Sequence, residues 1–104
     1  MALDNTAWAE HRAAVRDDVH YRARAIGPNR QSLTLLIVNI SAQGLMARYD
    51  GPMPVGATLS VTLPVVGVVL ATVRWSLGGR IGCELAAPVA LAKYYELLAA
   101  LGGR

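Results

Sequence analysis

Two arginines near the start of the chain are spaced so that both can hold one anionic ligand. Arg12 and Arg16 lie four residues apart in the segment Arg-Ala-Ala-Val-Arg. Residues four apart share one face of a helix, and in an extended segment they point to the same side. A planar guanidinium binds phosphate, carboxylate or a guanine edge through paired hydrogen bonds. The pair also fits a solvated basic surface, since Glu10, Asp17 and Asp18 lie beside it.

A second polar segment, residues 39–44 (Asn-Ile-Ser-Ala-Gln-Gly), falls between two apolar runs. Two roles are open for it. In a plain turn, Asn and Ser hydrogen-bond their own backbone and Gly permits an unusual backbone angle. In a binding loop, the Asn39 amide and the Ser41 hydroxyl meet a base edge, while Gly44 lets the backbone approach a ligand closely.

No group of residues in the sequence is typical of an enzyme active site. His11 and His20 are the only histidines, and Cys83 is the only cysteine. Cys83 lies in an apolar run, where a thiol usually packs as a small hydrophobe. The sequence has no nucleophile-elbow motif, no phosphate-binding glycine loop and no metal-site spacing of Cys and His. We therefore expect a binding protein that is not an enzyme and has no metal or cofactor.

Six short strands are expected to position these residues. Apolar and polar residues alternate with the period of two that is typical of half-buried strands. Turns that contain Gly or Pro separate the segments. The expected strands cover residues 19–25, 32–38, 45–49, 58–63, 66–75 and 80–85. Such an order favours a sandwich or a small closed barrel, and a closed barrel leaves no exposed strand edge.

An amphipathic helix is expected to follow the last strand. Pro88 suits its first turn, and the glycines at 102 and 103 suit its end. The helix has one broad face that carries, at helical spacing, Leu91, Tyr94, Tyr95, Leu98 and Leu101.

Trp75 belongs to a long apolar strand, so we expect its side chain in the core.

Length and composition fit one small domain. The chain has 104 residues, of which 54% are hydrophobic, and a net charge of +3. The start of the chain lacks the apolar core of a secretory signal, and polar residues, Pro and Gly interrupt the most apolar stretch, 57–71. We expect no membrane span and a cytoplasmic location, since a lone thiol suits a reducing compartment. A flexible lead-in is expected over residues 1–18, and a barrel with its helix over residues 19–104.

Taken in order, these motifs resemble the PilZ domain family. The resemblance covers roughly residues 10–101 and includes Arg-x-x-x-Arg, Asn-x-Ser-x-x-Gly, Val73-Arg74-Trp75 and the glycine-containing last strand. It implies a six-stranded antiparallel β-barrel with a C-terminal helix. It also implies a bacterial receptor for the second messenger cyclic di-GMP, whose phosphates and guanines are groups that arginine binds.

The resemblance also implies which residues bind the ligand. The two arginines would clamp guanine and phosphate, the asparagine oxygen would accept from guanine N–H groups, and the serine hydroxyl would bind nearby polar atoms. The glycine would preserve the loop. Binding would draw the lead-in onto the barrel and signal to a protein partner. The residues are Arg12, Arg16, Asn39, Ser41 and Gly44, with His11 as an additional candidate where the family often has another arginine.

Two other functions stay open at this point. A ligand-independent adaptor of the same fold would use the arginine pair only as part of its surface. A small barrel that binds single-stranded nucleic acid would need aromatic side chains stacked along a basic groove. The chain has no phenylalanine and offers few such side chains, so nucleic acid is the least favoured partner.

Overall fold

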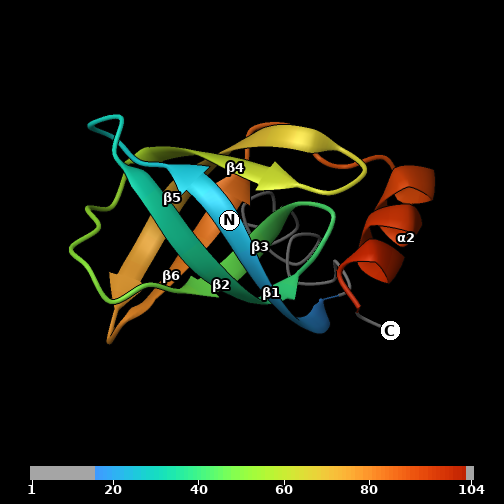
Figure 1. Ribbon diagram of the computed structural model, residues 1–104, viewed down its shortest axis with the longest axis horizontal. Helices are drawn as coiled ribbons and strands as arrows, with labels where there is room; N and C mark the ends of the chain where they lie inside the picture. Colours follow the sequence, from blue (N-terminus) through green and yellow to red (C-terminus); the bar gives the residue numbers. More distant parts are fainter. Residues whose placement is uncertain (1–15, 103–104) are drawn as a thin grey trace, which may run out of the picture.

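Six antiparallel strands form a closed barrel in the computed structural model, which describes residues 16–102 (Figure 1). Around the barrel the strands follow the order β1-β2-β3-β6-β5-β4, and β4 pairs with β1 to close it. The predicted antiparallel barrel with a C-terminal helix is confirmed. Its strands are β1 (Asp17–Ile26), β2 (Ser32–Ile40), β3 (Gly44–Arg48), β4 (Thr58–Leu63), β5 (Gly67–Leu77) and β6 (Arg80–Leu85).

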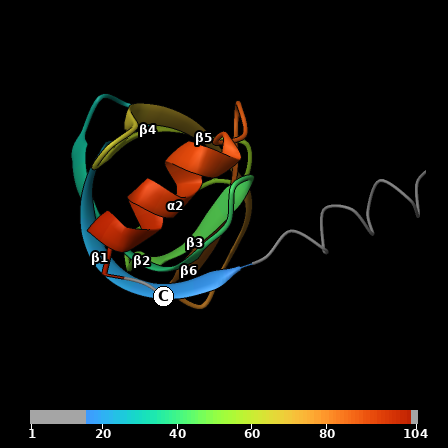
Figure 2. The same cartoon turned by 90° about the vertical axis from the view of Figure 1, so that its right-hand side faces the viewer.

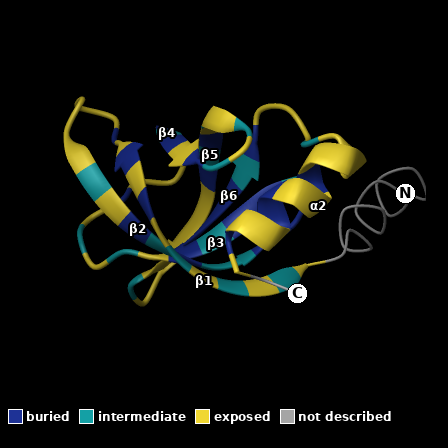
Figure 3. Ribbon diagram, turned by 45° about the vertical axis from the view of Figure 1, so that its right-hand side comes forward, coloured by how far each residue is buried: buried dark blue, intermediate teal, exposed yellow. Residues whose placement is uncertain are grey.

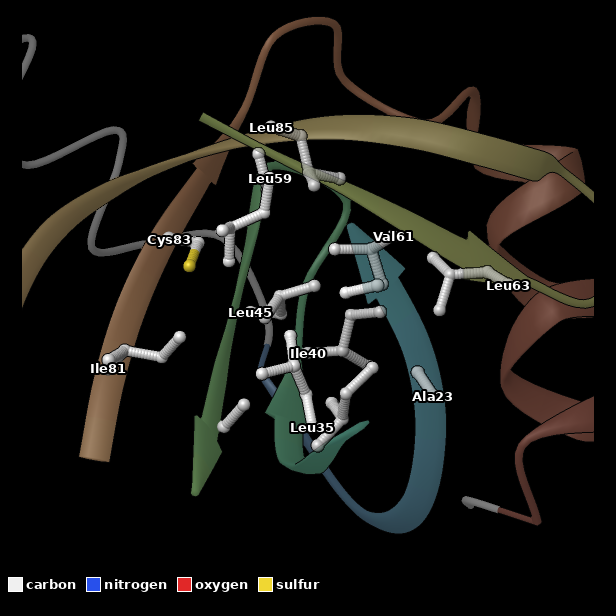
Figure 4. Packing of buried hydrophobic residues seen from close by; sticks show 14 of the residues in the cluster. Ala23, Leu35, Ile40, Leu45, Leu59, Val61, Leu63, Ile81, Cys83 and Leu85 are labelled. Atoms are coloured by element: carbon white, nitrogen blue, oxygen red, sulfur yellow. The ribbon is translucent and has the colours of Figure 1, made fainter. Parts of the chain in front are cut away.

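One face of every strand supplies the core of the barrel. Along much of each strand, buried residues alternate with more accessible ones (Figure 3). Figure 4 shows Leu35, Leu45, Val61 and other apolar side chains converging inside the barrel. Burial of one such side chain contributes about 1.5 to 3 kcal/mol. The core therefore explains why the sequence of most strands alternates between apolar and polar residues.

The polar segment between β2 and β3 is shorter than predicted. β2 continues through Ile40 and β3 begins at Gly44, which leaves residues 41–43 as the connection. Asn39 lies inside β2 and pairs with Met46 of β3. The predicted break at Asn39 was wrong because its backbone still belongs to the antiparallel ladder, although its side chain is polar.

The helix α2 (Leu91–Ala100) lies across one open end of the barrel (Figure 2). Its barrel-facing side is narrower than the sequence predicted. Leu91 and Tyr95 are 65% and 62% exposed, while the buried side chains are Tyr94, Leu97 and Leu98. The barrel mouth covers only about one side of the helix, so the flanking apolar residues stay in solvent. Within residues 16–102, no helix has the length and apolar character needed to cross a membrane.

Pro88 lies outside the helix rather than in its first turn. The Val89 N–H donates to the Ala42 carbonyl oxygen at 2.8 Å, which holds this segment against the connection between β2 and β3. Ala90 is extended, with φ −59° and ψ 144°, so coiling begins only at Leu91. The tertiary hydrogen bond therefore delays the start of the helix by one turn.

Tyr94 fastens α2 to the start of β1. Its hydroxyl lies 2.6 Å from Asp17 Oδ2 and 3.0 Å from the Ile40 carbonyl oxygen, and it can donate to either acceptor. Burial, followed by the hydrogen bond and the charge of Asp17, raises the pKa of the Tyr94 phenol. The hydroxyl thus stays protonated and links the helix, the end of β2 and the first residue of β1.

The stability of the barrel is expected to fall in mild alkali because of Cys83. The thiol is buried, as predicted, and desolvation raises its pKa from 9.0 to about 11. A group with a raised folded-state pKa stabilises the fold fully below the unfolded pKa, and this contribution is lost as the pH rises. Between pH 9 and pH 10 the free energy of unfolding should drop by about 1 kcal/mol through this thiol.

Urea unfolding of the protein and of a Cys83→Ala variant at several pH values checks this expectation. The variant should start less stable but lose less stability between pH 9 and pH 10 than the unsubstituted chain. Equal losses in the two proteins would show that the thiol does not drive the alkaline instability.

Candidate functional site

A surface cavity of about 360 Å³ opens where β3, β5 and β6 meet the start of β1. It contains three residues that the sequence singled out, which are Arg16, Ser41 and Gly44. Arg74 and Trp75 of β5 line the same cavity, as does Gln43. The fold therefore brings the second half of the Arg-x-x-x-Arg motif together with the Asn-x-Ser-x-x-Gly motif.

Asn39 joins this group through Arg16. The Arg16 guanidinium donates from Nη1 to Asn39 Oδ1 at 2.9 Å. Asn39 Nδ2 in turn lies 3.6 Å from the sulfur of Met46, a weak acceptor. An amide oxygen has two lone pairs, so Asn39 Oδ1 can hold Arg16 and still accept a second hydrogen bond. The arginine and the asparagine thus form a pair that is already assembled without ligand.

Ser41 organises the short connection from within. Its Oγ accepts from the Gln43 N–H at 3.1 Å, and its own N–H donates to the Gly44 carbonyl at 2.8 Å. Ser41 is 3% exposed, so its hydroxyl is a buried polar group held by the loop. Gln43 Oε1 is also buried and has no hydrogen-bond partner within residues 16–102. Such an acceptor is rare in folded proteins and suits a donor from outside the described chain.

Position 44 needs glycine because the β6 backbone lies close to it, and not because of the backbone angle of Gly44. Gly44 does not have a positive φ, so the unusual turn angle that the sequence suggested for it is wrong. A Cβ at this position would lie 2.5 Å from the Cys83 carbonyl oxygen of β6. The lack of a side chain lets β3 and β6 meet at the edge of the cavity.

Trp75 lies on the outer surface, and its predicted place in the core was wrong. The side chain is 41% exposed and lines the cavity. The reason is a β-bulge: Val73 pairs with Cys83, but Trp75 pairs with Gly82, which leaves Arg74 as the extra residue. One extra residue inverts the alternation, so Trp75 faces outward although Val73 two residues earlier is buried.

A matching bulge in β2 exposes Asn39. Ile37 pairs with Ala47 while Asn39 pairs with Met46, so Val38 is the extra residue. The two bulges bring one cross-strand row to the outer face of the barrel. We call this the site row, and it consists of Asn39, Met46, Gly82 and Trp75.

The indole of Trp75 lies directly on the backbone of Gly82. A Cβ at Gly82 would overlap the indole atoms Nε1, Cε2 and Cδ1, so glycine is the residue that lets the ring pack against this strand. An exposed ring held in this way offers a surface on which a nucleobase can stack. Trp75 and Gly82 were missed as site residues, although both belong to motifs that carry the family resemblance.

Two guanidinium groups, from Arg16 and Arg74, and the carboxylate of Glu84 line the cavity. Arg16 lies at its edge, and Arg74 Nε donates to Glu84 Oε1 at 2.8 Å. The Arg74–Glu84 pair is solvent-exposed and contributes little to stability. No cluster of His, Cys, Asp and Glu within residues 16–102 is arranged to hold a metal ion. The chemistry of the cavity is thus that of anion and base binding.

A comparison with protein families matches residues 10–100 to the PilZ domain. The chain belongs to the PilZ domain family. This family consists of binding and adaptor domains that include cyclic di-GMP receptors. No curated protein matches the chain.

Two predicted ligand residues of this PilZ domain lie outside the described part of the chain. His11 and Arg12 fall within the matched range but before residue 16. Of the other predicted residues, Arg16, Ser41 and Gly44 line the cavity and Asn39 is hydrogen-bonded to its edge.

Proposed function

We propose that this PilZ domain is a cytoplasmic receptor that binds cyclic di-GMP in the cavity between the start of β1 and the site row. Arg12 and Arg16 bind phosphate and guanine, Asn39 and Ser41 bind polar atoms of the base, and Gly44 keeps the cavity open. His11 adds a further contact. The proposal requires neither catalysis nor a cofactor. Its main support is the joint presence of Arg16, the Ser41–Gly44 connection and an exposed tryptophan at one cavity.

The chemistry of the cavity matches that of the ligand. A guanine presents the acceptors O6 and N7 to an arginine and donors from N1 and N2 to an amide oxygen. Asn39 Oδ1 has a free lone pair beside Arg16, and the Trp75 ring offers a face for stacking. The phosphates are suited to the guanidinium groups that line the same cavity. Each part of the ligand therefore has a complementary group nearby.

Hydrogen bonds connect this cavity to α2, which supports relay of the binding event. The Tyr94 hydroxyl lies within hydrogen-bond distance of Asp17, the residue after Arg16, and of the Ile40 carbonyl just before the connection. Val89 bonds to the Ala42 carbonyl within the connection. We infer that ligand binding orders the segment before Arg16 and tightens these links, and that a partner protein responds to the change.

Calorimetric titration with cyclic di-GMP, with GTP as the control, tests the receptor proposal. We expect saturable heat with cyclic di-GMP alone. Ligand at about 100 times its dissociation constant should stabilise the fold by about 2.7 kcal/mol. For a domain of this size, the melting temperature should rise by about 10 °C. Absence of both heat and thermal shift would contradict the proposal and favour a ligand-independent adaptor.

Replacing Tyr94 with phenylalanine tests the relay. The variant loses the hydroxyl that donates to Asp17 or to the Ile40 carbonyl, which should lower the free energy of unfolding by about 1 to 2 kcal/mol. It should still bind cyclic di-GMP, because Tyr94 does not line the cavity. Hydrogen exchange of the α2 amides should slow on binding in the parent protein and change less in Tyr94→Phe. Equal slowing in both proteins would show that the signal does not pass through Tyr94.

Because Trp75 is exposed, these titrations must include a single-stranded nucleic acid as an additional ligand. The sequence argued against single-stranded nucleic acid partly because Trp75 was expected in the core, and that reason is removed. Among residues 16–102, however, one exposed aromatic ring lines the cavity, whereas a nucleic-acid channel stacks successive bases on several rings. We expect an oligothymidine to bind far more weakly than cyclic di-GMP. Tighter and strongly salt-dependent binding of the oligothymidine would favour the nucleic-acid function.

A further inference from the structure

A row of arginines crosses the barrel next to the site row. Cross-strand pairing brings Arg22 opposite Leu36, Leu36 opposite Arg48, and Arg48 opposite Arg80. Leu77 pairs with Arg80 at the far end of this row. Leu36 lies between the buried residues Leu35 and Ile37, Arg48 follows buried Ala47, and Arg80 precedes buried Ile81, so this row faces outward, and Leu77 at its end is exposed. We call this the arginine row, and it consists of Arg22, Leu36, Arg48, Arg80 and Leu77.

The charges of the arginine row are not neutralised within the described chain. Like charges directly opposite each other, such as Arg48 and Arg80, destabilise a sheet. No carboxylate within residues 16–102 forms an ion pair with Arg22, Arg48 or Arg80. Arg74, by contrast, is paired with Glu84. The row therefore carries a positive potential that an acidic partner would relieve.

The surface beside these arginines is hollowed. A cavity of about 460 Å³ is lined by Arg22 and Arg48 together with Thr34, Leu36 and Tyr49. Asp50 also lines it and is the single carboxylate among its lining residues. The cavity thus offers guanidinium and hydroxyl donors around the aliphatic side chain of Leu36, which suits an acidic chain that also carries apolar side chains.

We propose that the arginine row is the docking surface for an acidic, leucine-containing segment of a partner protein. Charge complementarity argues for the acidic residues. Leu77 argues for the apolar ones, because it is 79% exposed at the end of the row and Leu36 lies between two arginines. A phosphate polymer would leave Leu77 in water, and Tyr49 is the one aromatic residue of the described chain that lines this cavity. Both features favour a protein segment over nucleic acid.

The arginine row lies next to the site row, so a partner bound to it would be affected by a ligand in the cavity. Met46 and Arg48 are two residues apart on β3, as are Gly82 and Arg80 on β6, so the two rows are neighbours on one face. A partner on the arginine row would thus lie beside a ligand in the cavity. This docking surface rests on the proposed function, since it is where the partner protein would bind. The peptide experiment uses no nucleotide, so a failure of peptide binding is distinct from a failure of cyclic di-GMP binding.

Fluorescence anisotropy with a labelled peptide tests the docking surface. The probe is a short peptide in which glutamates alternate with leucines, and a lysine–leucine peptide and an oligothymidine serve as comparisons. We expect the acidic peptide to bind the unmodified protein in low salt and to weaken with added salt. The double variant Arg48→Glu/Arg80→Glu should bind it about tenfold more weakly or worse. The melting temperature reports whether the variant is folded.

Two further variants keep the result interpretable. Lys93→Glu makes the same type of charge reversal on exposed α2, away from the row, and should leave the affinity within about twofold. Leu77→Ser should weaken peptide binding without changing its salt dependence. Peptide binding that is absent, or equal in the parent protein and the double variant, would overturn the proposal. Tighter binding of the oligothymidine, unaffected by Leu77→Ser, would assign the row to nucleic acid instead.

Discussion

Replacing Arg16 with alanine is expected to weaken cyclic di-GMP binding by about 100-fold or more, since two charge-assisted hydrogen bonds contribute about 3 kcal/mol. Arg16 lines the cavity, and its guanidinium is held by Asn39 at 2.9 Å. The substitution therefore removes the donors and also frees the asparagine that orients them. Because Arg16 is exposed and forms no buried contact, the stability of the free protein should change by less than about 0.5 kcal/mol.

Arg24→Ala is the matched control for this experiment. Arg24 is exposed on β1 and lies outside the cavity, so its loss removes one positive charge without removing a ligand contact. Calorimetry of the two variants separates a specific contact from general electrostatic attraction. An Arg16→Lys variant separates charge from shape, because lysine cannot form the paired hydrogen bonds of a guanidinium. Unchanged affinity for cyclic di-GMP in Arg16→Ala would show that Arg16 is not part of the binding site.

Removing the indole of Trp75 is expected to weaken binding by about 10-fold to 100-fold, because stacking of one base on an aromatic ring contributes about 1 to 3 kcal/mol. Trp75 is partly exposed, so Trp75→Ala leaves the core intact. A Trp75→Phe variant keeps an aromatic face and should retain most of the affinity.

Gly82→Ala tests the same surface without removing the tryptophan. The added Cβ would overlap the indole where it lies on Gly82, so the ring must move away from its present position. Gly82 does not have a positive φ, and its backbone therefore accepts alanine. We expect a loss of affinity similar to that of Trp75→Ala. Leu77→Ala is the control, because Leu77 lies on β5 like Trp75 but outside the cavity. Full affinity in both Trp75→Ala and Gly82→Ala would show that no base stacks on this ring.

The strands were predictable because the barrel buries one face of each. β4 and β6 begin and end where the sequence predicted, since Thr58–Leu63 alternates without interruption and glycines mark the turn before Arg80. The α2 face was less predictable, because which apolar side chains become buried depends on the width of the barrel mouth. Leu91 and Tyr95 have helical spacing but nothing covers them within residues 16–102.

The candidate site was only half predictable, and the β-bulges are the reason. A bulge adds one residue without any strong sequence signal, and it reverses the facing of every later side chain in that strand. Arg16, Ser41 and Gly44 were found from motif spacing, which does not depend on facing. Trp75 was assigned to the core because it belongs to a long apolar strand, and the pairing with Gly82 shows why it faces outward instead.

The most direct test of the account follows the fluorescence of Trp75 during a ligand titration. Trp8→Phe leaves Trp75 as the single tryptophan of the chain, so every change in emission reports on the cavity. We predict a saturable change in emission with cyclic di-GMP that GTP does not reproduce and that Arg16→Ala shifts to about 100-fold higher ligand concentration or beyond. Emission that stays constant across the cyclic di-GMP titration, or that changes equally with GTP, would contradict a cyclic di-GMP site at Arg16 and Trp75.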